Sequence, residues 1–412
     1  MPASIMQIGA CEVCGNTHLI KVLDLGSHPM CDDLIRIGDP RVSLEYPIEI
    51  LFCENCLTAH QRFQIPKQEL FPTNYHYRAR FTADVLEGMA GLVDICEERF
   101  GDLAGKTVLD IGCNDGSLLD FFKKKGAITL GVEPTDAQKD ATSKGHKTFN
   151  AFFDTNIADE VLTTYGQPDF IIFTNVFAHI ENLQELILAL RVLIAVDTVI
   201  VIENHYLGAV LDGSQFDTFY HEHPRTYSCN SFVYIARSLG VDILSVEFPR
   251  RYGGNVRVFM GSRKNASIAN DISDVVNNER VFPAKFEILA QRVDQWRQNK
   301  KESINQLIAQ HGKLRAKAFP GRAAILVKLL GLTEESISAV YEKPGSLKIG
   351  HYVPGTRIPI ISDDILFEEE SHDQPLLNLA WHISDEIRHY LADRGYDGPI
   401  IDIVDKSDFG VE

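Results

Sequence analysis

Four cysteines occur as two pairs whose spacing suits a metal ion. Cys11 and Cys14 form one Cys-x-x-Cys pair, and Cys53 and Cys56 form another. Each pair brings two thiolates to one ion, so that two pairs complete a tetrahedral site, and four protein ligands leave no open position for catalysis. We therefore predict a structural zinc site. The alternatives are buried thiols without a metal, or a redox-active pair.

A loop that follows a predicted strand has the composition of a ligand-binding turn. The stretch Thr107–Leu119 reads as a short buried strand, a tight turn and the start of a helix. Gly112 and Gly116 allow backbone to approach a ligand closely, and Asn114 is a residue type common in turns. Their Gly-x-x-x-Gly spacing differs from the dinucleotide fingerprint and from the phosphate-binding loop. Asp110, just before the turn, would repel a phosphate but suits a cation such as an ammonium group.

A second acidic residue follows the next predicted strand. Glu133 comes 23 residues after Asp110 and suits the hydroxyl groups of a ribose. The loop, Asp110 and Glu133, in this order, resemble the cofactor site of a class I S-adenosylmethionine (SAM) methyltransferase. The resemblance implies that SAM is the cofactor. The alternative is a doubly wound α/β domain that binds no nucleotide.

Further candidates lie on later segments of the same predicted domain. Phe153, within the aromatic stretch 149–154, either covers the adenine or belongs to the core. Asn175 lies in the stretch 169–180, which holds a predicted strand whose end should face the ligand. His179 comes four residues later and is either a core histidine or a functional one.

The most polar aromatic stretch of the chain lies between residues 215 and 228. It contains Tyr220, Glu222 and His223, so that a phenol, a carboxylate and an imidazole lie within four residues. These groups suit general acid–base catalysis, in which a histidine is the usual proton carrier. The alternatives are a solvated loop and a metal site, and the metal site lacks a third ligand at a suitable spacing.

Size and charge limit the possible architectures and partners. A chain of 412 residues with 45% hydrophobic residues should form two or three domains with substantial cores. Its formal charge of −17 argues against nonspecific binding to nucleic acid or to an anionic membrane. We find no long apolar segment and no signal peptide, and eight cysteines are too few for a disulfide scaffold. We therefore expect a cytoplasmic protein.

The predicted elements divide the chain into four parts. A zinc-binding module (1–70) precedes an α/β SAM-binding domain (71–265), whose first helix is expected at 83–100. A helical connector (266–317) then leads to a smaller α/β domain (318–412) that begins with a strand at 323–327. The expected fold class is therefore α/β, with a Rossmann-like SAM domain and a second Rossmann-like domain at the C-terminus.

The order of these features resembles the sugar C-methyltransferases, which act on nucleotide-linked 4-keto-deoxysugars. The shared features are the cysteine pairs, the SAM loop, the Tyr-x-Glu-His sequence at Tyr220–His223 and the second α/β domain, and they cover nearly the whole chain. The resemblance implies a monomer whose substrate lies between the domains, with the nucleotide held partly by the C-terminal domain. The family's Gly-x-Gly-x-x-x-Lys loop is missing, because the chain has Phe319–Leu326 there and retains only Gly321.

The resemblance also implies a set of catalytic residues. Its members are Tyr220, Glu222, His223, His179 and one of the two linker tyrosines, Tyr75 or Tyr77. We expect His223 to remove the C3 proton of a nucleotide-linked 4-keto-6-deoxyhexose, with Glu222 fixing its tautomer. Tyr220, His179 or the linker tyrosine would hydrogen-bond the enolate oxygen. The alternatives are a zinc-containing RNA or small-molecule methyltransferase and a noncatalytic binding protein on the same fold.

Overall fold

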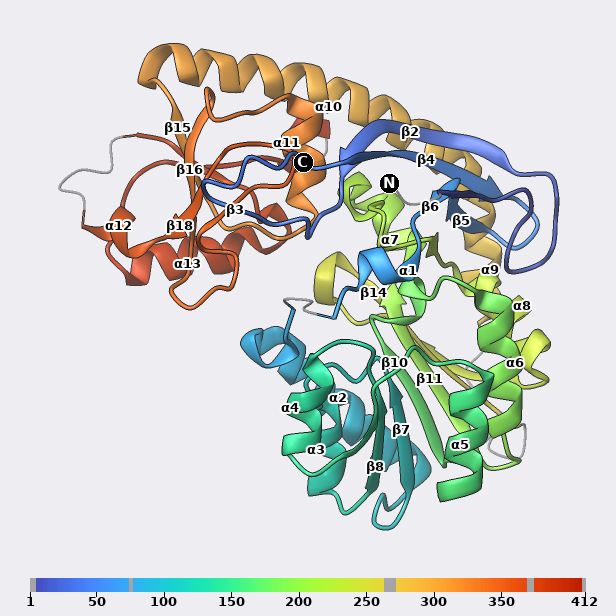
Figure 1. The fold of residues 1–412 in the computed structure, drawn as a ribbon. Helices are drawn as coiled ribbons and strands as arrows, with labels where there is room; N and C mark the ends of the chain where they lie inside the picture. The colour runs from blue at the N-terminus through green and yellow to red at the C-terminus, as the bar shows by residue number, and fades with distance from the viewer. Residues whose placement is uncertain (1–4, 74–76, 263–271, 369–373, 410–412) are drawn as a thin grey trace.

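The computed structural model describes residues 5–73, 77–262, 272–368 and 374–409. Figure 1 shows a central domain built on a large sheet and, above it, an N-terminal β-sheet module beside a smaller α/β domain. A long helix, α10 (Phe282–His311), runs over both upper parts. Within the described ranges, no helix combines the length and the apolar character needed to cross a membrane.

The central domain contains a seven-stranded sheet in the order β13-β14-β11-β10-β7-β8-β9. Neighbouring strands are parallel except at β14, which is antiparallel to β11 and β13. The chain runs from β7 outward to β9 and then crosses to β10, so that the switch point lies between β7 and β10, where open α/β sheets bind ligands. The strands are β7 (Thr107–Ile111), β8 (Ile128–Val132), β9 (Lys147–Phe149), β10 (Phe170–Thr174), β11 (Val199–His205), β13 (Asp242–Glu247) and β14 (Asn255–Gly261).

Helices cover both faces of this sheet, because its strands are apolar on both sides. Val108 of β7 packs in one core cluster with α2 (Ala83–Phe100) and α3 (Ser117–Lys124). Leu109 and Ile111 pack on the opposite face, in a second cluster. That face is covered by α5 (Thr155–Tyr165), α6 (Leu183–Leu193) and α8 (Cys229–Leu239), whereas α4 (Ala137–Ser143) packs beside α3. The α/β fold class and the first helix are confirmed.

The N-terminal module is built on a four-stranded antiparallel sheet in the order β12-β5-β4-β2. Its strands are β2 (Ile20–Pro29), β4 (Glu45–Cys53), β5 (Thr58–Gln61) and β12 (Arg225–Thr226), and β1 (Met6–Gln7) pairs separately with β6 (Phe63–Gln64). Strand β12 comes from the chain between β11 and β13 of the central sheet. The segment that carries Tyr220–His223 therefore leaves the central sheet and ends in the N-terminal one.

The C-terminal domain has a five-stranded parallel sheet in the order β18-β16-β15-β19-β20. Its strands are β15 (Leu314–Lys317), β16 (Ile337–Glu342), β18 (Ile360–Ser362), β19 (Leu376–Asn378) and β20 (Ile400–Asp402), with helices α11 (Ala323–Leu330), α12 (Asp364–Phe367) and α13 (Ser384–Asp393). The connector is mostly helical as expected, but its last helix ends at His311, and β15 occupies the end of the expected range. The strand expected at 323–327 is wrong, because these residues belong to the helix α11. A short apolar run suits a buried strand or a buried helix equally well.

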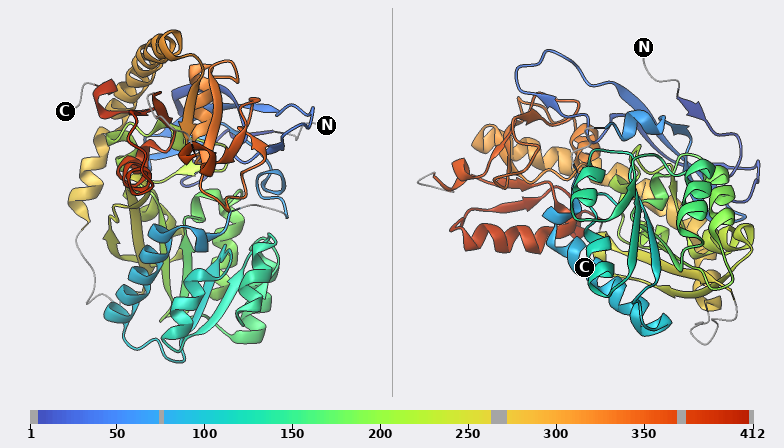
Figure 2. Two further views of the ribbon diagram at one scale, coloured as in Figure 1. Left: turned by 90° about the vertical axis from the view of Figure 1, so that its left-hand side faces the viewer. Right: turned by 60° about the horizontal axis from the view of Figure 1, so that its bottom comes forward.

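One hydrophobic core joins the N-terminal module to the C-terminal domain. Phe52 of β4 lies 5.1 Å from Phe286 of α10, and Trp296 of the same helix lies 4.9 Å from Phe216, between ring centroids. A strand pair also joins these two parts, β3 (Ile35–Arg36) with β17 (His351–Tyr352). In the left view of Figure 2 the two parts lie together above the central domain.

Candidate active site

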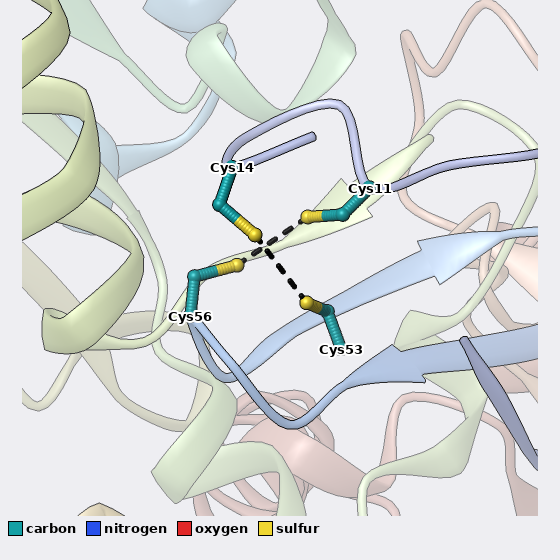
Figure 3. A group of neighbouring side chains, drawn as sticks. All are labelled: Cys11, Cys14, Cys53 and Cys56. Atoms are coloured by element: carbon teal, nitrogen blue, oxygen red, sulfur yellow. Dashed lines mark hydrogen bonds between the residues drawn. The ribbon is translucent and has the colours of Figure 1, made fainter. Parts of the chain in front are cut away.

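The four cysteines of the predicted metal site converge on one point (Figure 3). Their Sγ atoms all lie within 4.8 Å of one another, with Cys11 3.4 Å from Cys56 and Cys14 3.6 Å from Cys53. Sulfurs bound to zinc at about 2.3 Å and tetrahedral angles would be roughly 3.8 Å apart. All four are free cysteines, and their arrangement fits a zinc ion.

Polar side chains support the sulfurs from a second layer. Asn55 Nδ2 donates to Cys14 Sγ at 3.3 Å, and the Thr58 hydroxyl lies 3.0 Å from Cys56 Sγ. Such contacts favour the thiolate form that a metal requires. Because all four positions around the ion would be occupied by protein, the chemistry of this site is structural.

Asp110 lies buried at the carboxyl end of β7. Among the described residues, its Oδ1 has no hydrogen-bond partner. Burial, and to a lesser extent the nearby Glu133 carboxylate, raise the pKa of Asp110 to about 8. A buried carboxyl group without a partner is unfavourable unless a ligand supplies a donor. The residue therefore fits an ammonium or another donor group of SAM.

The loop after β7 depends on a glycine. Gly112 has a φ of +76°, and a Cβ there would lie 2.5 Å from the side chain of Val176. Its N–H donates to the Val132 carbonyl at 2.8 Å, and the N–H of Asn114 donates to Glu133 Oε2 at 3.1 Å. These bonds hold the loop against the end of β8, with Glu133 beside the ligand space.

The other candidate cofactor residues differ in their positions. Phe153 and Asn175 both line the cavity of about 810 Å³ that lies beside the cofactor loop. Phe153 also belongs to the hydrophobic core, so that both alternatives for this residue fit its position. Asn175 has a φ of +55°, and its Oδ1 accepts from Asn255 Nδ2 at 3.2 Å. Gly116 instead packs against Ala141, away from the described cavity walls, and serves the turn.

One cavity of about 810 Å³ connects the three parts of the molecule. The cofactor loop at 110–114 forms one wall, and the segment 220–223 contributes Tyr220, Glu222 and His223. Loops of the C-terminal domain at 320–322 and 342–348 form another wall. A ligand beside His223 can therefore touch residues of the C-terminal domain while it faces the cofactor site.

Three histidines and a tyrosine form the polar centre of this cavity. The ring centroid of His223 lies 4.2 Å from that of Tyr220, 4.8 Å from that of His179 and 5.4 Å from that of His205. His179 follows β10, and His205 is the last residue of β11. The sequence-based analysis missed His205, although the rule that singled out His179, a polar residue at the carboxyl end of a strand, applies to it equally.

The hydrogen bond of His223 determines its tautomer. Its Nδ1 lies 3.0 Å from the Thr218 carbonyl oxygen. Because a carbonyl can only accept, Nδ1 carries the proton and Nε2 of the neutral ring has a free lone pair. We expected Glu222 to fix this tautomer. That expectation is wrong, since the turn brings the Thr218 carbonyl to Nδ1, while Glu222 lines the cavity.

Burial keeps the groups of this cluster uncharged. It places the pKa of His223 well below its usual value, with repulsion from His179 and His205 adding to the effect. Burial also lowers the pKa of His179 to about 4, and it raises the pKa of Tyr220 well above 10. At neutral pH the cluster therefore contains an unprotonated imidazole base and a protonated phenol.

Two further features were not predicted from the sequence. Asn204 is buried in the cavity wall, and neither its Oδ1 nor its Nδ2 has a hydrogen-bond partner among the described residues. Arg322 binds the Asp217 carboxylate through two hydrogen bonds of 2.8 and 2.5 Å, and Trp381 Nε1 donates to the same carboxylate at 2.9 Å. Arg322 is 105 residues from Asp217 in the chain, so no local pattern indicates this pair.

Only one of the two linker tyrosines lies within the residues that the structure describes. Tyr75 lies outside the described residues. Tyr77 lines the cavity, and its backbone carbonyl accepts from Asn114 Nδ2 at 3.2 Å. This contact joins the linker to the cofactor loop.

Family models match three consecutive stretches of the chain. A zinc binding domain matches residues 11–71, a methyltransferase domain residues 76–246, and a C-methyltransferase C-terminal domain residues 250–399. The C-methyltransferase NovU of Streptomyces niveus is 27% identical over 392 residues, which are 93% of this chain and 92% of that protein.

Solved structures resemble the chain over less than half of its length. Magnesium protoporphyrin IX methyltransferase (ChlM) from Synechocystis PCC 6803 with bound SAH is 17% identical, with a TM-score of 0.34, over 43% of this chain and 83% of that one. The PH0226 protein from Pyrococcus horikoshii OT3 is 12% identical, with a TM-score of 0.35, over 47% of this chain and 97% of that one. From the family models, the NovU alignment and the site geometry, we conclude that the chain is a SAM-dependent methyltransferase, and its flanking regions match models of a zinc binding domain and of a C-methyltransferase C-terminal domain.

Proposed function

We propose that the chain transfers the methyl group of SAM to C3 of a nucleotide-linked 4-keto-6-deoxyhexose. The observation that carries this proposal is the single cavity shared by the SAM loop, His223 and the loops of the C-terminal domain. A substrate with its sugar ring at His223 and its nucleotide at the C-terminal domain fits this cavity. The similarity to a C-methyltransferase over most of the chain favours transfer to carbon.

His223 is the general base in this proposal. A ketone at C4 makes the C3 proton acidic, because the electrons of the C3–H bond are delocalised into an enolate. Nε2 of His223 accepts that proton, and the Thr218 carbonyl stabilises the resulting imidazolium through Nδ1. The proton later passes to solvent when the product leaves.

Neutral donors stabilise the enolate oxygen. Tyr220 keeps its phenolic proton at neutral pH and lies next to His223, so that its hydroxyl can donate to this oxygen. His179, whose ring centroid lies 4.8 Å from that of His223, is a second candidate donor. When bound, SAM would supply an electrophilic methyl group for C3 of the enolate and would leave as SAH, a neutral thioether. The walls of the cavity hold both reactants in one orientation and thereby contribute to the rate.

The test is a methyl-transfer assay with a panel of nucleotide-linked 4-keto-6-deoxyhexoses. Mass spectrometry should show a gain of one methylene for at least one of them. A substrate with deuterium at C3 distinguishes the sites of transfer, because methylation at C3 removes the deuterium and methylation of a hydroxyl retains it. If no member of the panel is methylated although SAH binds, the proposed substrate class is wrong.

A variant of the base tests the mechanism separately. His223→Asn should lower turnover by about 10²- to 10⁴-fold, the usual contribution of a general base, while SAH affinity stays unchanged. His311→Asn, at the exposed end of α10, is the matched control. Near wild-type turnover in His223→Asn would show that another group removes the proton.

A further inference from the structure

The C-terminal sheet reverses its strand order beside the cavity. From β15 the chain proceeds through β16 to β18 on one side, and then to β19 and β20 on the other. The switch point lies between β15 and β19, and open α/β sheets bind ligands outside the carboxyl ends of the strands at such a point. The loops that follow β15 and β16 line the cavity, together with His382 after β19.

The loop after β15 repeats the hydrogen bonding of the cofactor loop. In the central domain, Gly112 follows β7 with a φ of +76° and donates to the Val132 carbonyl at 2.8 Å. In the C-terminal domain, Ala318 follows β15 with a φ of +61° and donates to the Tyr341 carbonyl at 3.0 Å. Both carbonyls belong to the residue that precedes an acid at the end of the next strand.

These two acids have similar contacts, although the donor is two residues after Gly112 in one loop and directly after Ala318 in the other. Glu133 accepts the N–H of Asn114 at 3.1 Å, and Glu342 accepts the N–H of Phe319 at 2.5 Å through Oε1. Both acids line the cavity. In mononucleotide-binding units, an acid at this place hydrogen-bonds the ribose hydroxyls. Within the described part of the chain no residue donates to Oε2 of Glu342, which leaves that oxygen for a ligand.

Basic residues lie close to Glu342. Lys343 is its neighbour in the chain, and Lys348 Nζ donates to the Phe319 carbonyl at 2.6 Å. Both lysines line the cavity, whereas Arg322, which also lines it, is already paired with Asp217. Because the whole chain has a charge of −17, this local group of cations favours an anionic ligand at this wall. A nucleoside diphosphate offers hydroxyl groups to the acid and phosphates to the cations.

We propose, on the basis of the proposed function, that Glu342 binds the 2′- and 3′-hydroxyls of the substrate's ribose, so that the substrate is a ribonucleotide sugar. Each hydroxyl donates to one carboxylate oxygen, and Oε1 can accept this bond in addition to the Phe319 N–H. A 2′-deoxyribose lacks one of the two donors. Loss of one charge-assisted hydrogen bond corresponds to about 10- to 100-fold in affinity.

Matched pairs of nucleotides test this assignment. Calorimetric titration of the SAH-saturated protein would compare ADP, GDP, CDP and UDP with their 2′-deoxy forms. In the pair with the preferred base, the ribonucleotide should bind about 10- to 100-fold more tightly. Glu342→Gln retains an acceptor for the Phe319 N–H but should bring the ratio close to one. Glu335→Gln, just before β16 with 82% of its side chain exposed, should leave the ratio unchanged.

The opposite outcomes separate this inference from the proposed function. Equal affinities within every pair, or a ratio that Glu342→Gln leaves unaltered, would overturn the assignment of Glu342. Methylation of a thymidine-linked 4-keto sugar as fast as of its ribose analogue would do the same, although the proposed function would stand. If SAH binds but no nucleoside diphosphate does, both are wrong.

Discussion

At His223, burial and a single hydrogen bond together prepare a base that needs no activation. The Thr218 carbonyl fixes the proton on Nδ1, and the surrounding histidines oppose a second proton on the ring. His223 therefore stays neutral over a wider range than a histidine in water, whose pKa is about 6.5. A low pKa weakens a base, but the stabilised enolate lowers the basicity that is required.

This environment predicts an unusual pH dependence. A histidine base is active in its unprotonated form, which dominates above its pKa, and burial lowers that pKa. With a substrate that is methylated, kcat/KM should therefore change by less than about twofold between pH 8 and pH 6 and should fall only at lower pH. A tenfold decrease centred near pH 6.5 would show that the proton acceptor is solvated like a free imidazole.

Asp110 allows a prediction in which stability and binding change in opposite directions. Asp110→Asn removes a buried carboxyl group whose Oδ1 has no partner in the described structure, so that the unfolding temperature of the ligand-free protein should stay equal or rise. The affinity for SAH should fall by about 10- to 100-fold, since a charge-assisted contact is lost. Thermal unfolding and calorimetry measure the two effects.

The exposed Asp197 offers a matched control, because Asp197→Asn makes the same substitution just before β11, away from the cofactor loop. Asp197→Asn should alter neither the unfolding temperature nor the affinity for SAH. A large loss of stability in Asp110→Asn would mean that this carboxylate has a structural partner.

Strand β12 connects the zinc module to the catalytic segment. It begins two residues after His223 and pairs with β5, which follows the second cysteine pair. The buried Arg225 of this strand binds the Glu12 carboxylate at 2.8 Å and the Glu181 carbonyl at 3.3 Å. The module thus contacts the segments that carry both His223 and His179, which gives the zinc site a positioning role.

Loss of zinc should consequently disturb catalysis more than cofactor binding. In Cys14→Ser we expect less than one zinc ion per chain, a lower unfolding temperature and a large decrease in kcat. SAH affinity should change less, because the core between the central sheet and α2 and α3 contains no residue of the zinc module. Metal analysis, thermal unfolding and calorimetry provide the measurements. Cys96→Ala, in a buried cysteine of α2, should retain the ion. Unchanged kcat in a zinc-free variant would contradict the positioning role.

The elements that the sequence predicted well are those with a strong local pattern. Helix α2 has a long amphipathic repeat, strand β7 a short apolar run before a glycine turn, and the cysteine pairs a fixed spacing. The missed features depend on contacts between distant segments. Strand β12 has only two residues and exists because β5 lies beside it, and α11 is apolar on nearly every side because other elements surround it.

At the scale of the whole molecule, a buried ion pair joins the C-terminal domain to the segment that leads to His223. Arg322 of the C-terminal domain binds Asp217 with two hydrogen bonds, next to Thr218, whose carbonyl holds His223. Lys328 and Glu45 form a second pair between domains, at 2.5 Å, but their side chains are 40% and 32% exposed. Both ion pairs link the C-terminal domain to another part of the chain, but only the Arg322–Asp217 pair is buried. Comparing them therefore tests the effect of burial.

Breaking the buried pair should cost stability and slow catalysis, whereas breaking the exposed pair should do little. Asp217→Asn or Arg322→Gln should each destabilise the protein by about 3–5 kcal/mol, because the remaining charge is buried without its partner. The double variant should lose less than the sum, with a coupling of about 0.5–3 kcal/mol. Glu45→Gln should cost no more than about 1 kcal/mol.

Because Asp217 positions the segment that holds the His223 tautomer, kcat should fall in Asp217→Asn while SAH affinity remains that of the wild type. Denaturant unfolding and methyl-transfer kinetics measure these quantities, and equal effects from both pairs would show that burial does not distinguish them.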